Sequence, residues 1–461
     1  MIAVLNKCFN YSNSREFRGS FEFKLCPRER DTSLIDRYSK RMPGVFFRAF
    51  LTLNLAFFGF DVSADENQTS KGDFETCVQS VDPDRVSSSQ LATLDLDSII
   101  SSCKASFEAD PKNMRAAALL ARALSIGKRY PESIEFARIS AEGGDAVGMN
   151  VLGHLFLKGL GVEKDEIEAV HWFTESFNRG NVIATFNLGV LYDRGIGVPE
   201  DEFLGVDLLR QAADRGFAPS QRLLGDAYLQ GRGVARDNDE AVHWYREAIK
   251  RGDARAANKL ADLLFYGVML EKVEKEYFHG VPKAYQNLPE AHRLYRLAAE
   301  AGLASGMFGL GLTFASHDLP EHSLEKAVTW YKRAAGSNHS EAMAYLGFAY
   351  EDGHGVEQDY AEARQWFERA AQRGSLFGME NFARLVSWGR GGPQDHELAA
   401  EWYIRAIEAG VNWIFDDAEN WSPETISEVQ KQLQNLGLYD GVVDGRHSPE
   451  FHNALTLLNQ R

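Results

Sequence analysis

The sequence lacks the short motifs that identify the common classes of enzyme. Its 461 residues contain no HExxH zinc motif, no GxSxG nucleophile turn, no Walker phosphate loop, no CxxC pair and no dinucleotide-binding fingerprint. The residue pattern therefore predicts no cofactor, no metal site and no catalytic residue. We expect a protein that is not an enzyme.

Positive charge is also scarce. Lys and Arg number 50 against 66 Asp and Glu, which gives a net charge of -16. Such a surface repels the phosphates of nucleic acid, and no basic cluster with interleaved aromatic residues offsets the repulsion. We therefore expect no nucleic acid among the partners.

Long apolar runs are absent except near the N-terminus. An apolar core over residues 49–60 is too short for a comfortable transmembrane helix. The residues Val62, Ser63 and Ala64 that follow it suit cleavage by signal peptidase. We therefore predict a signal peptide over residues 42–64.

The start of the chain allows two interpretations. In the first, translation begins at Met42, residues 1–41 are a leader of doubtful meaning, and the mature chain begins near Asp65. In the second, residues 45–60 remain as an uncleaved anchor. Both place the rest of the protein outside the inner membrane, so we expect a periplasmic protein that meets the membrane only through this segment.

Cysteine is rare, with four residues in the whole chain. Cys8 and Cys26 fall in the doubtful leader, which leaves Cys77 and Cys103 as an even number in the exported part. We predict that they form a disulfide that staples the N-terminal segment, residues 65–109. Two unpaired buried thiols are the alternative.

What the sequence does contain is a repeat. Glycines recur at a spacing of 36 residues, and the series resumes after an insertion of 14 residues. The closing positions are Gly144, Gly180, Gly216, Gly252, Gly302, Asn338, Gly374 and Gly410. A residue able to cap a helix stands at one phase of each copy: Asp165, Asp201, Asp237, Asn287, Ser323, Asp359 and Asp395.

Each copy is predicted to be a pair of helices. Small and bulky residues alternate at helical spacing before and after a turn that often reads GxGV, and glycine tolerates the backbone angles of such a turn. One helical hairpin cannot bury its own apolar face, so the copies must stack. We therefore predict an all-α fold, a right-handed α-solenoid of stacked αα-hairpins with a small helical C-terminal module.

The unit resembles the Sel1-like repeat of the tetratricopeptide-like superfamily, through the pattern AxxxLGxxY, GxGV and DxxxAxxWYxxAAxxG over residues 145–411. With a degenerate leading copy the array spans residues 110–411, with an insertion at 269–288. The resemblance implies an exported scaffold for protein-protein interaction in the bacterial cell envelope. A repeat enzyme that acts on the cell wall or hydrolyses β-lactams is the alternative. The segment around the two cysteines resembles the opening of exported repeat proteins of this kind, which supports the disulfide.

Solenoids offer an extended concave face, and selectivity would lie in first-helix residues that vary between copies at one phase. The predicted contact residues at this phase are His154, Val190, Asp226, Asp262, Leu312, Phe348 and Arg384.

Past a linker at residues 412–423, the segment 424–461 changes character. It resembles a peptidoglycan-binding domain of the three-helix type. The motif residues of that resemblance are Tyr439, Asp440, Gly441, Asp444 and Gly445. Two interpretations stay open, a module that tethers the array to peptidoglycan and a hairpin that merely caps the last apolar face.

Overall fold

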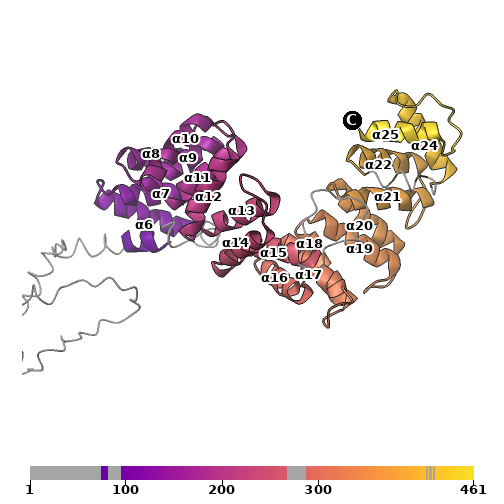
Figure 1. The fold of residues 1–461 in the computed structure, drawn as a ribbon, viewed down its shortest axis with the longest axis horizontal. Coiled ribbons are helices and arrows are strands. Elements are labelled where there is room, and N and C mark those ends of the chain that lie inside the picture. The colour runs from indigo at the N-terminus through magenta and orange to yellow at the C-terminus, as the bar shows by residue number, and fades with distance from the viewer. Residues whose placement is uncertain are drawn as a thin grey trace, which may run out of the picture. The chain divides into compact units, whose positions relative to one another are not determined.

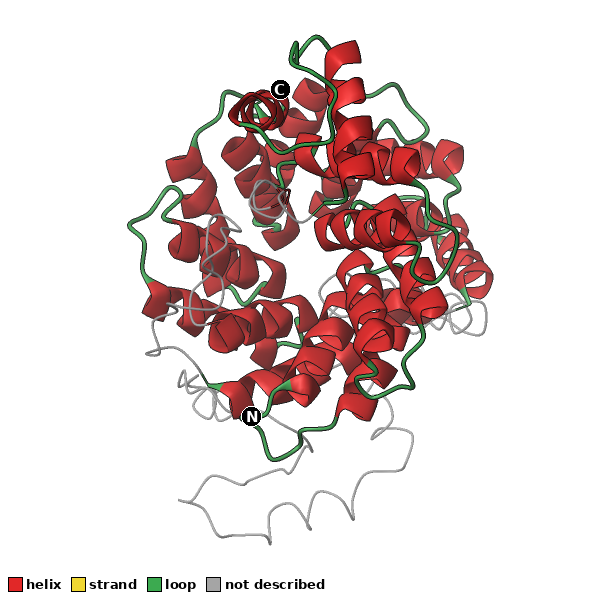
Figure 2. Cartoon of the chain, turned by 90° about the vertical axis from the view of Figure 1, so that its right-hand side faces the viewer, coloured by secondary structure: helices red, strands yellow, loops and turns green. Residues whose placement is uncertain are grey.

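The computed structural model describes residues 74–80, 95–266, 287–411, 414, 418 and 421–460. The predicted leader and signal peptide, and most of the predicted insertion, lie outside these residues. Every regular element in the described part of the chain is helical (Figures 1 and 2). The predicted all-α solenoid of stacked hairpins is confirmed.

The described helices fall into a leading group, seven hairpins and a closing pair. The leading group consists of a helix over residues 74–80, α6 (Leu96–Ala109), α7 (Met114–Ile126) and α8 (Tyr130–Glu142). The first helices of the hairpins, called A helices below, are α9 (Ala146–Lys158), α11 (Val182–Arg194), α13 (Ala218–Gln230), α15 (Ala254–Tyr266), α17 (Ala304–Ala315), α19 (Ser340–Asp352) and α21 (Leu376–Trp388).

The second helices, called B helices below, are α10 (Glu166–Asn178), α12 (Glu202–Asp214), α14 (Asn238–Lys250), α16 (Leu288–Glu300), α18 (Leu324–Gly336), α20 (Tyr360–Gln372) and α22 (His396–Glu408). The closing pair is α24 (Pro423–Asn435) and α25 (Pro449–Asn459). Each helix packs mainly on its neighbours along the chain (Figure 1).

Each B helix begins where its capping residue predicts. All seven predicted caps accept a hydrogen bond on the side chain from a backbone N–H in the first helical turn. These bonds satisfy backbone N–H donors that have no partner within the helix. The recurring Asp, Asn or Ser before each B helix is therefore a helix cap in every copy.

The two glycines of the GxGV turn have different functions. Gly159 ends α9 in the left-handed conformation with φ of 65°, which a residue with a side chain rarely adopts. Gly161 lies against α8 of the preceding hairpin, where an added Cβ would come within 2.6 Å of the Tyr130 carbonyl oxygen. The first glycine therefore turns the chain, and the second lets the turn touch the previous copy.

Small residues also mark close contacts between helices. A Cβ on Gly205 of α12 would lie 2.8 Å from the backbone nitrogen of Asp193 in α11. A Cβ on Gly306 of α17 would lie 2.5 Å from the Ala298 methyl group in α16. The small phase of each B helix therefore faces its own A helix, and the small phase of each A helix faces the preceding B helix.

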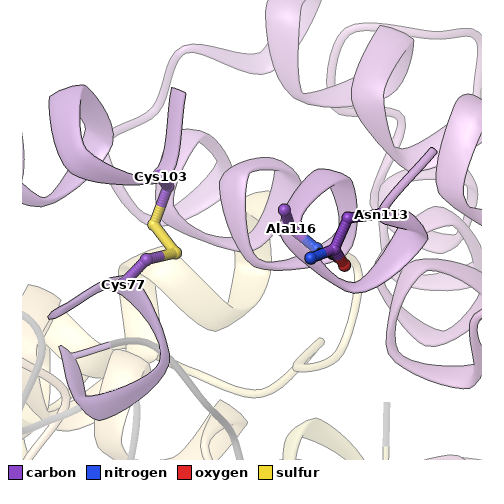
Figure 3. The surroundings of a disulfide bond; sticks show 4 residues. All are labelled: Cys77, Cys103, Asn113 and Ala116. Carbon is purple, nitrogen blue, oxygen red and sulfur yellow. Dashed lines mark hydrogen bonds between the residues drawn. A yellow bond between two sulfur atoms is a disulfide. The ribbon is translucent and has the colours of Figure 1, made fainter. Parts of the chain in front are cut away.

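The N-terminal end of the array is closed by the predicted disulfide. Cys77 and Cys103 are bridged, and both are fully buried (Figure 3). They pack with Ile99 and Ile100 of α6 and with leucines of α7. Asn113 accepts a hydrogen bond from the Ala116 N–H at the start of α7, which fixes the helix that this cluster covers (Figure 3).

The C-terminal end is closed by the pair α24 and α25. Residues of this pair share one apolar core with α22, and the predicted linker contributes to the same core through Ile414, Ala418 and Trp421. The Trp421 ring stacks on Tyr403 of α22 at 4.0 Å between centroids. The segment after Val411 therefore packs on the last hairpin and buries its apolar face.

In the part of the chain that the structure describes, no helix has the length and apolar character needed to span a bilayer.

Candidate functional site

The predicted contact residues occupy the ninth position of each A helix, and we call them the contact row: His154, Val190, Asp226, Asp262, Leu312, Phe348 and Arg384. The position before each is Gly or Ala, because an aromatic or bulky side chain of the B helix lies against it. A Cβ on Gly225 would come within 2.7 Å of the Tyr245 ring, and one on Gly347 within 2.6 Å of Phe367. The ninth residue is turned away from this contact, and every row member is exposed or only partly buried.

Two carboxylates of the row lie in adjacent hairpins and have the same kind of partner. The Tyr245 hydroxyl donates to Asp226 Oδ1 at 2.6 Å, and the Tyr295 hydroxyl donates to Asp262 Oδ1 at 2.7 Å. Burial raises the pKa of Tyr245, and the nearby charges of Asp226 and Asp262 raise it further. The structure therefore brings these two predicted residues together.

The two carboxylates differ in their compensation. Arg222 lies 3.8 Å from Asp226 and 3.2 Å from Asp253. At the equivalent position of the next copy stands Asn258, whose amide donates to Asp262 at 3.0 Å. No ion pair between Asp262 and a Lys or Arg is present among the described residues.

The protonation of Asp262 reflects this environment. Burial raises the pKa of Asp262 to about 6, although the Tyr295 hydrogen bond and the charge of Lys259 act in the opposite direction. At neutral pH Asp262 is therefore largely ionised and only weakly compensated by its surroundings.

Leu312 and Phe348, the next two members of the row, line a single apolar pocket of about 420 Å³. Val328 and Tyr331 of α18 and Phe377 of α21 complete its walls together with neighbouring residues. The centroid of the Phe348 ring lies 5.0 Å from that of the buried Phe367 ring, and this edge-to-face contact supports Phe348. The pocket can receive large apolar side chains.

Arg384 is already engaged within the protein. Its guanidinium donates to both carboxylate oxygens of Glu351, at 2.9 and 2.7 Å, and lies 5.1 Å over the Trp388 ring. A bidentate pair with a buried carboxylate fixes the side chain. Arg384 therefore joins two neighbouring A helices, α19 and α21.

The N-terminal members of the row stand apart. His154 on α9 is exposed and Val190 on α11 is partly buried. The described contacts include no hydrogen bond or ion pair between His154 and another member of the row. The structure therefore brings together Asp226 with Asp262 and Leu312 with Phe348. It does not join His154 or Val190 to these pairs in the same way.

Sequence reasoning missed a recurring ion pair between copies. Asp193 lies 3.1 Å from Arg232, and Glu351 lies 4.0 Å from Arg390. In both cases the acid is the twelfth residue of an A helix, and the Arg stands between turn glycines of the next copy. The separation is 39 residues in both pairs, a signal that a search for charges at fixed offsets would have found.

The motif residues of the C-terminal module hold its loop. Buried Gln430 of α24 accepts from the Asp444 and Gly445 backbone N–H groups at 3.1 and 3.0 Å and donates to Asp444 Oδ1 at 3.3 Å. The Tyr439 hydroxyl donates to the Val442 carbonyl at 2.9 Å. These contacts give the motif a structural function.

The motif residues differ in exposure, because Gly445 is buried, Gly441 is partly buried and Asp440 is exposed. A Cβ on Gly445 would meet the Pro423 carbonyl oxygen, and Gly441 lies beside the Tyr439 ring. The carboxylates of Asp440 and Asp444 are exposed. The two acidic residues are thus the members of the motif that a ligand could reach.

A hydroxyl-imidazole cluster lies where the closing pair meets the array. Thr425 Oγ1 is 2.9 Å from His396 Nδ1 and 2.7 Å from Ser387 Oγ. Thr425 and Ser387 are buried, and Ser422 caps α24 by accepting from the Thr425 N–H. A substrate cannot reach these hydroxyls, so the cluster joins α24 to α21 and α22.

In the described ranges, no group of three or more His, Cys, Asp or Glu residues is arranged to hold a metal ion.

Known proteins with the same fold were found by structure. The chain is similar to c5321, a protective antigen present in uropathogenic Escherichia coli strains that displays an SLR fold, with 20% identity over 94% of both chains and a TM-score of 0.55. It is also similar to a Sel1 repeat protein from Oxalobacter formigenes, with 26% identity over 56% of this chain and 96% of that chain and a TM-score of 0.49. No curated protein matches the sequence.

The family model that describes the Sel1 repeat matches the sequence in consecutive copies. The matched stretches are residues 146–181, 182–217, 218–253, 254–303, 304–339, 340–375 and 383–411. They cover more than half of the chain, and each of the first six begins at the first residue of an A helix. The chain therefore belongs to the Sel1 repeat family.

Proposed function

We propose that this chain is an exported scaffold of the bacterial cell envelope that binds a protein partner along the contact row. Sel1 repeats generally mediate protein-protein interaction, and proteins built from them are generally not catalysts. The observation that supports a binding surface here is the apolar pocket lined by Leu312 and Phe348, in a row that also holds Asp262, whose hydrogen-bond partners in the described chain are neutral. Apolar pockets with a few placed polar groups are the usual form of a binding site.

Export is supported by two features of the chain. Residues 42–64 have the pattern of a signal peptide, and they lie outside the described residues. The bridge between Cys77 and Cys103 is stable in an oxidising compartment such as the periplasm. N-terminal sequencing of the protein from a periplasmic extract tests the proposal, with a start near Asp65 expected. A start at Met1 or Met42 would contradict cleavage.

Partner binding is tested by co-purification from the envelope. The tagged protein and its Phe348→Ala variant are cross-linked in intact cells, purified and compared by mass spectrometry. Phe203→Ala is the matched control, because Phe203 is a Phe of α12 that is 77% exposed and lies outside the row. We expect the same partner with the native chain and the control, and its loss with Phe348→Ala. Equal recovery with all three proteins would remove the row from the binding surface.

Attachment to peptidoglycan is a second proposal, supported by the resemblance of residues 424–461 and by the exposed carboxylates of Asp440 and Asp444. Purified protein is incubated with labelled sacculi and centrifuged. Pelleting that is lost in an Asp440→Ala variant supports attachment. Release of soluble fragments would instead favour the wall-enzyme alternative.

A further inference from the structure

We infer that the partner presents an extended polypeptide segment in which a basic side chain is followed, about three to six residues along, by large apolar side chains. The inference rests on the proposed function, because it specifies the ligand of the same contact row.

The charge of the row selects a cationic group. Asp226 is compensated by Arg222, whereas Asp262 has only the neutral Asn258 and Tyr295 as its hydrogen-bond partners in the described chain. Asn258 stands where the next repeat would have an equivalent of Arg222, so this repeat lacks the positive charge. A Lys or Arg side chain of the partner would supply it. The net charge of -16 steers cationic segments toward the protein as a whole.

An acidic segment is the poorer fit to the row. The basic row member, Arg384, has both of its outer nitrogens bound to Glu351 and its planar group over Trp388. A carboxylate of the partner would have to displace Glu351 and leave that buried acid with only the more distant Arg390, at 4.0 Å, which is costly. The row therefore offers one carboxylate, Asp262, whose hydrogen-bond partners in the described chain are neutral, and one arginine that already forms an ion pair.

The apolar part of the segment belongs in the pocket. Leu312 and Phe348 line about 420 Å³ of space, enough for one or two large side chains. Apolar side chains that fill a pocket of this kind give most of the binding energy of an interface. The neighbouring acid then determines which sequence is accepted.

The spacing follows from the repeat. α15, which holds Asp262, contacts α17, which holds Leu312. Packed helices lie about 8 to 10 Å apart, and an extended chain advances about 3.3 Å per residue. One step between A helices therefore corresponds to about three residues, and the pocket lies one to two steps from Asp262.

The test uses a synthetic probe and the whole mature chain. The probe is a fluorescein-labelled peptide with two lysines, a spacer of four Gly and Ser residues, and two phenylalanines. Fluorescence anisotropy gives the affinity of the native chain and of four variants. Asp262→Asn and Phe348→Ala alter the row. Asp214→Asn removes an exposed carboxylate at the end of α12, and Phe203→Ala removes an exposed ring near the start of the same helix. Circular dichroism and melting confirm that all variants fold.

We expect Asp262→Asn to weaken binding about fivefold to tenfold, because it removes one charge pair. Phe348→Ala should weaken binding by about tenfold or more, because it empties one wall of the pocket. Both controls should stay within about twofold, the range of near-neutral contacts. A probe with Glu in place of Lys should bind at least about tenfold more weakly, since it loses the attraction and adds repulsion.

Two results would overturn the inference: a Glu probe that binds as tightly as the Lys probe, or affinities that do not change in either row variant. The envelope cross-linking separates this failure from that of the proposed function. If Phe348→Ala abolishes capture of the native partner while the Lys probe does not bind, the ligand chemistry is wrong and the binding row stands. If capture is also unchanged, both fail.

Discussion

The two ends of the array are closed in different ways. At the N-terminal end, the bridge between Cys77 and Cys103 joins a short helix to α6, and the two cysteines pack with six other buried apolar residues of the described chain. At the C-terminal end, α24 and α25 cover α22 through a cluster of eighteen such residues, with Trp421 stacked on Tyr403. The smaller apolar cluster is thus reinforced by a covalent bond, which adds to its stability, whereas the larger cluster relies on buried apolar area.

This difference separates the conditions under which each end opens. The N-terminal closure depends on the redox state of two thiols, and the C-terminal closure depends on packing alone. Because neighbouring repeats stabilise each other, loss of either closure should spread inward from that end. The following predictions are ordered by the size of the expected effect.

Phe451→Ala should open the C-terminal end and leave the other end intact. Phe451 of α25 is fully buried, and removal of a buried Phe ring typically costs about 3 to 5 kcal/mol. Hydrogen exchange should become fast in α24, α25 and α22, with no change in α6 and α7. Val442→Ala is the control, because that side chain is 76% exposed. Equal protection in both variants would mean that the closing pair does not stabilise α22.

Replacement of both Cys77 and Cys103 by Ala should open the N-terminal end of the array and leave the C-terminal end intact. The bridge spans 26 residues of sequence, and loss of such a loop closure costs about 3 kcal/mol. Exchange should rise in α6 and α7 and stay unchanged in α24 and α25, and dithiothreitol should reproduce the effect in the native protein. Insensitivity to the reductant together with freely alkylated thiols in the unreduced protein would refute the bridge.

Ala363→Trp should damage the sixth of the seven hairpins, which consists of α19 and α20. Ala363 of α20 is fully buried at the small phase of its B helix, and a larger side chain there costs about 1 to 3 kcal/mol. The adjacent Glu362→Ala should cost about 1 kcal/mol or less, because its side chain stays near solvent. Exchange from residue 340 to 411 should rise more in the first variant. Equal exchange would mean that the buried face of α20 is misassigned.

Asp262→Asn should produce the smallest change, and one that depends on pH. The pKa of Asp262 is raised from 3.8 to about 6 in the fold, so the protonated acid is favoured by folding. The protonated Asp262 side chain therefore adds to the free energy of unfolding. This gain is fully present below about pH 4 and is lost as the pH rises through about 6. The variant should therefore melt roughly 2 °C higher than the native protein at pH 7.5, and the difference should vanish near pH 4. A constant difference across this range would show that Asp262 does not titrate as its burial implies.

The sequence predicts the repeat, the caps and the turns because these depend on local chemistry. A capping residue such as Asp237 acts within three residues of itself, and Gly159 acts on its own backbone. The pairs Asp193 with Arg232 and Glu351 with Arg390 were missed because they depend on how one copy lies against the next. The composition of the contact row was predicted, but the contrast between Asp226 and Asp262 depends on side chains that only the folded array brings near.

The C-terminal motif shows the limit of resemblance. Its residues were predicted to form a glycan-binding motif, yet Tyr439 and Gly445, together with Gln430 of α24, hold the loop itself. A sequence pattern records the residues that a fold keeps, whether for a ligand or for its own backbone. Only the exposed Asp440 remains to be explained by a ligand, because the Asp444 carboxylate accepts hydrogen bonds within the loop.

The second glycine of the turn has a consequence for how such a gene can grow. Gly161 touches α8 of the copy before it, and Gly197 of the next turn touches α10 in the same manner. Both halves of this contact are encoded within any two consecutive copies, so a tandem duplication of whole repeats brings matching surfaces with it. The array can therefore lengthen in evolution without a new interface, while its two closing structures remain single.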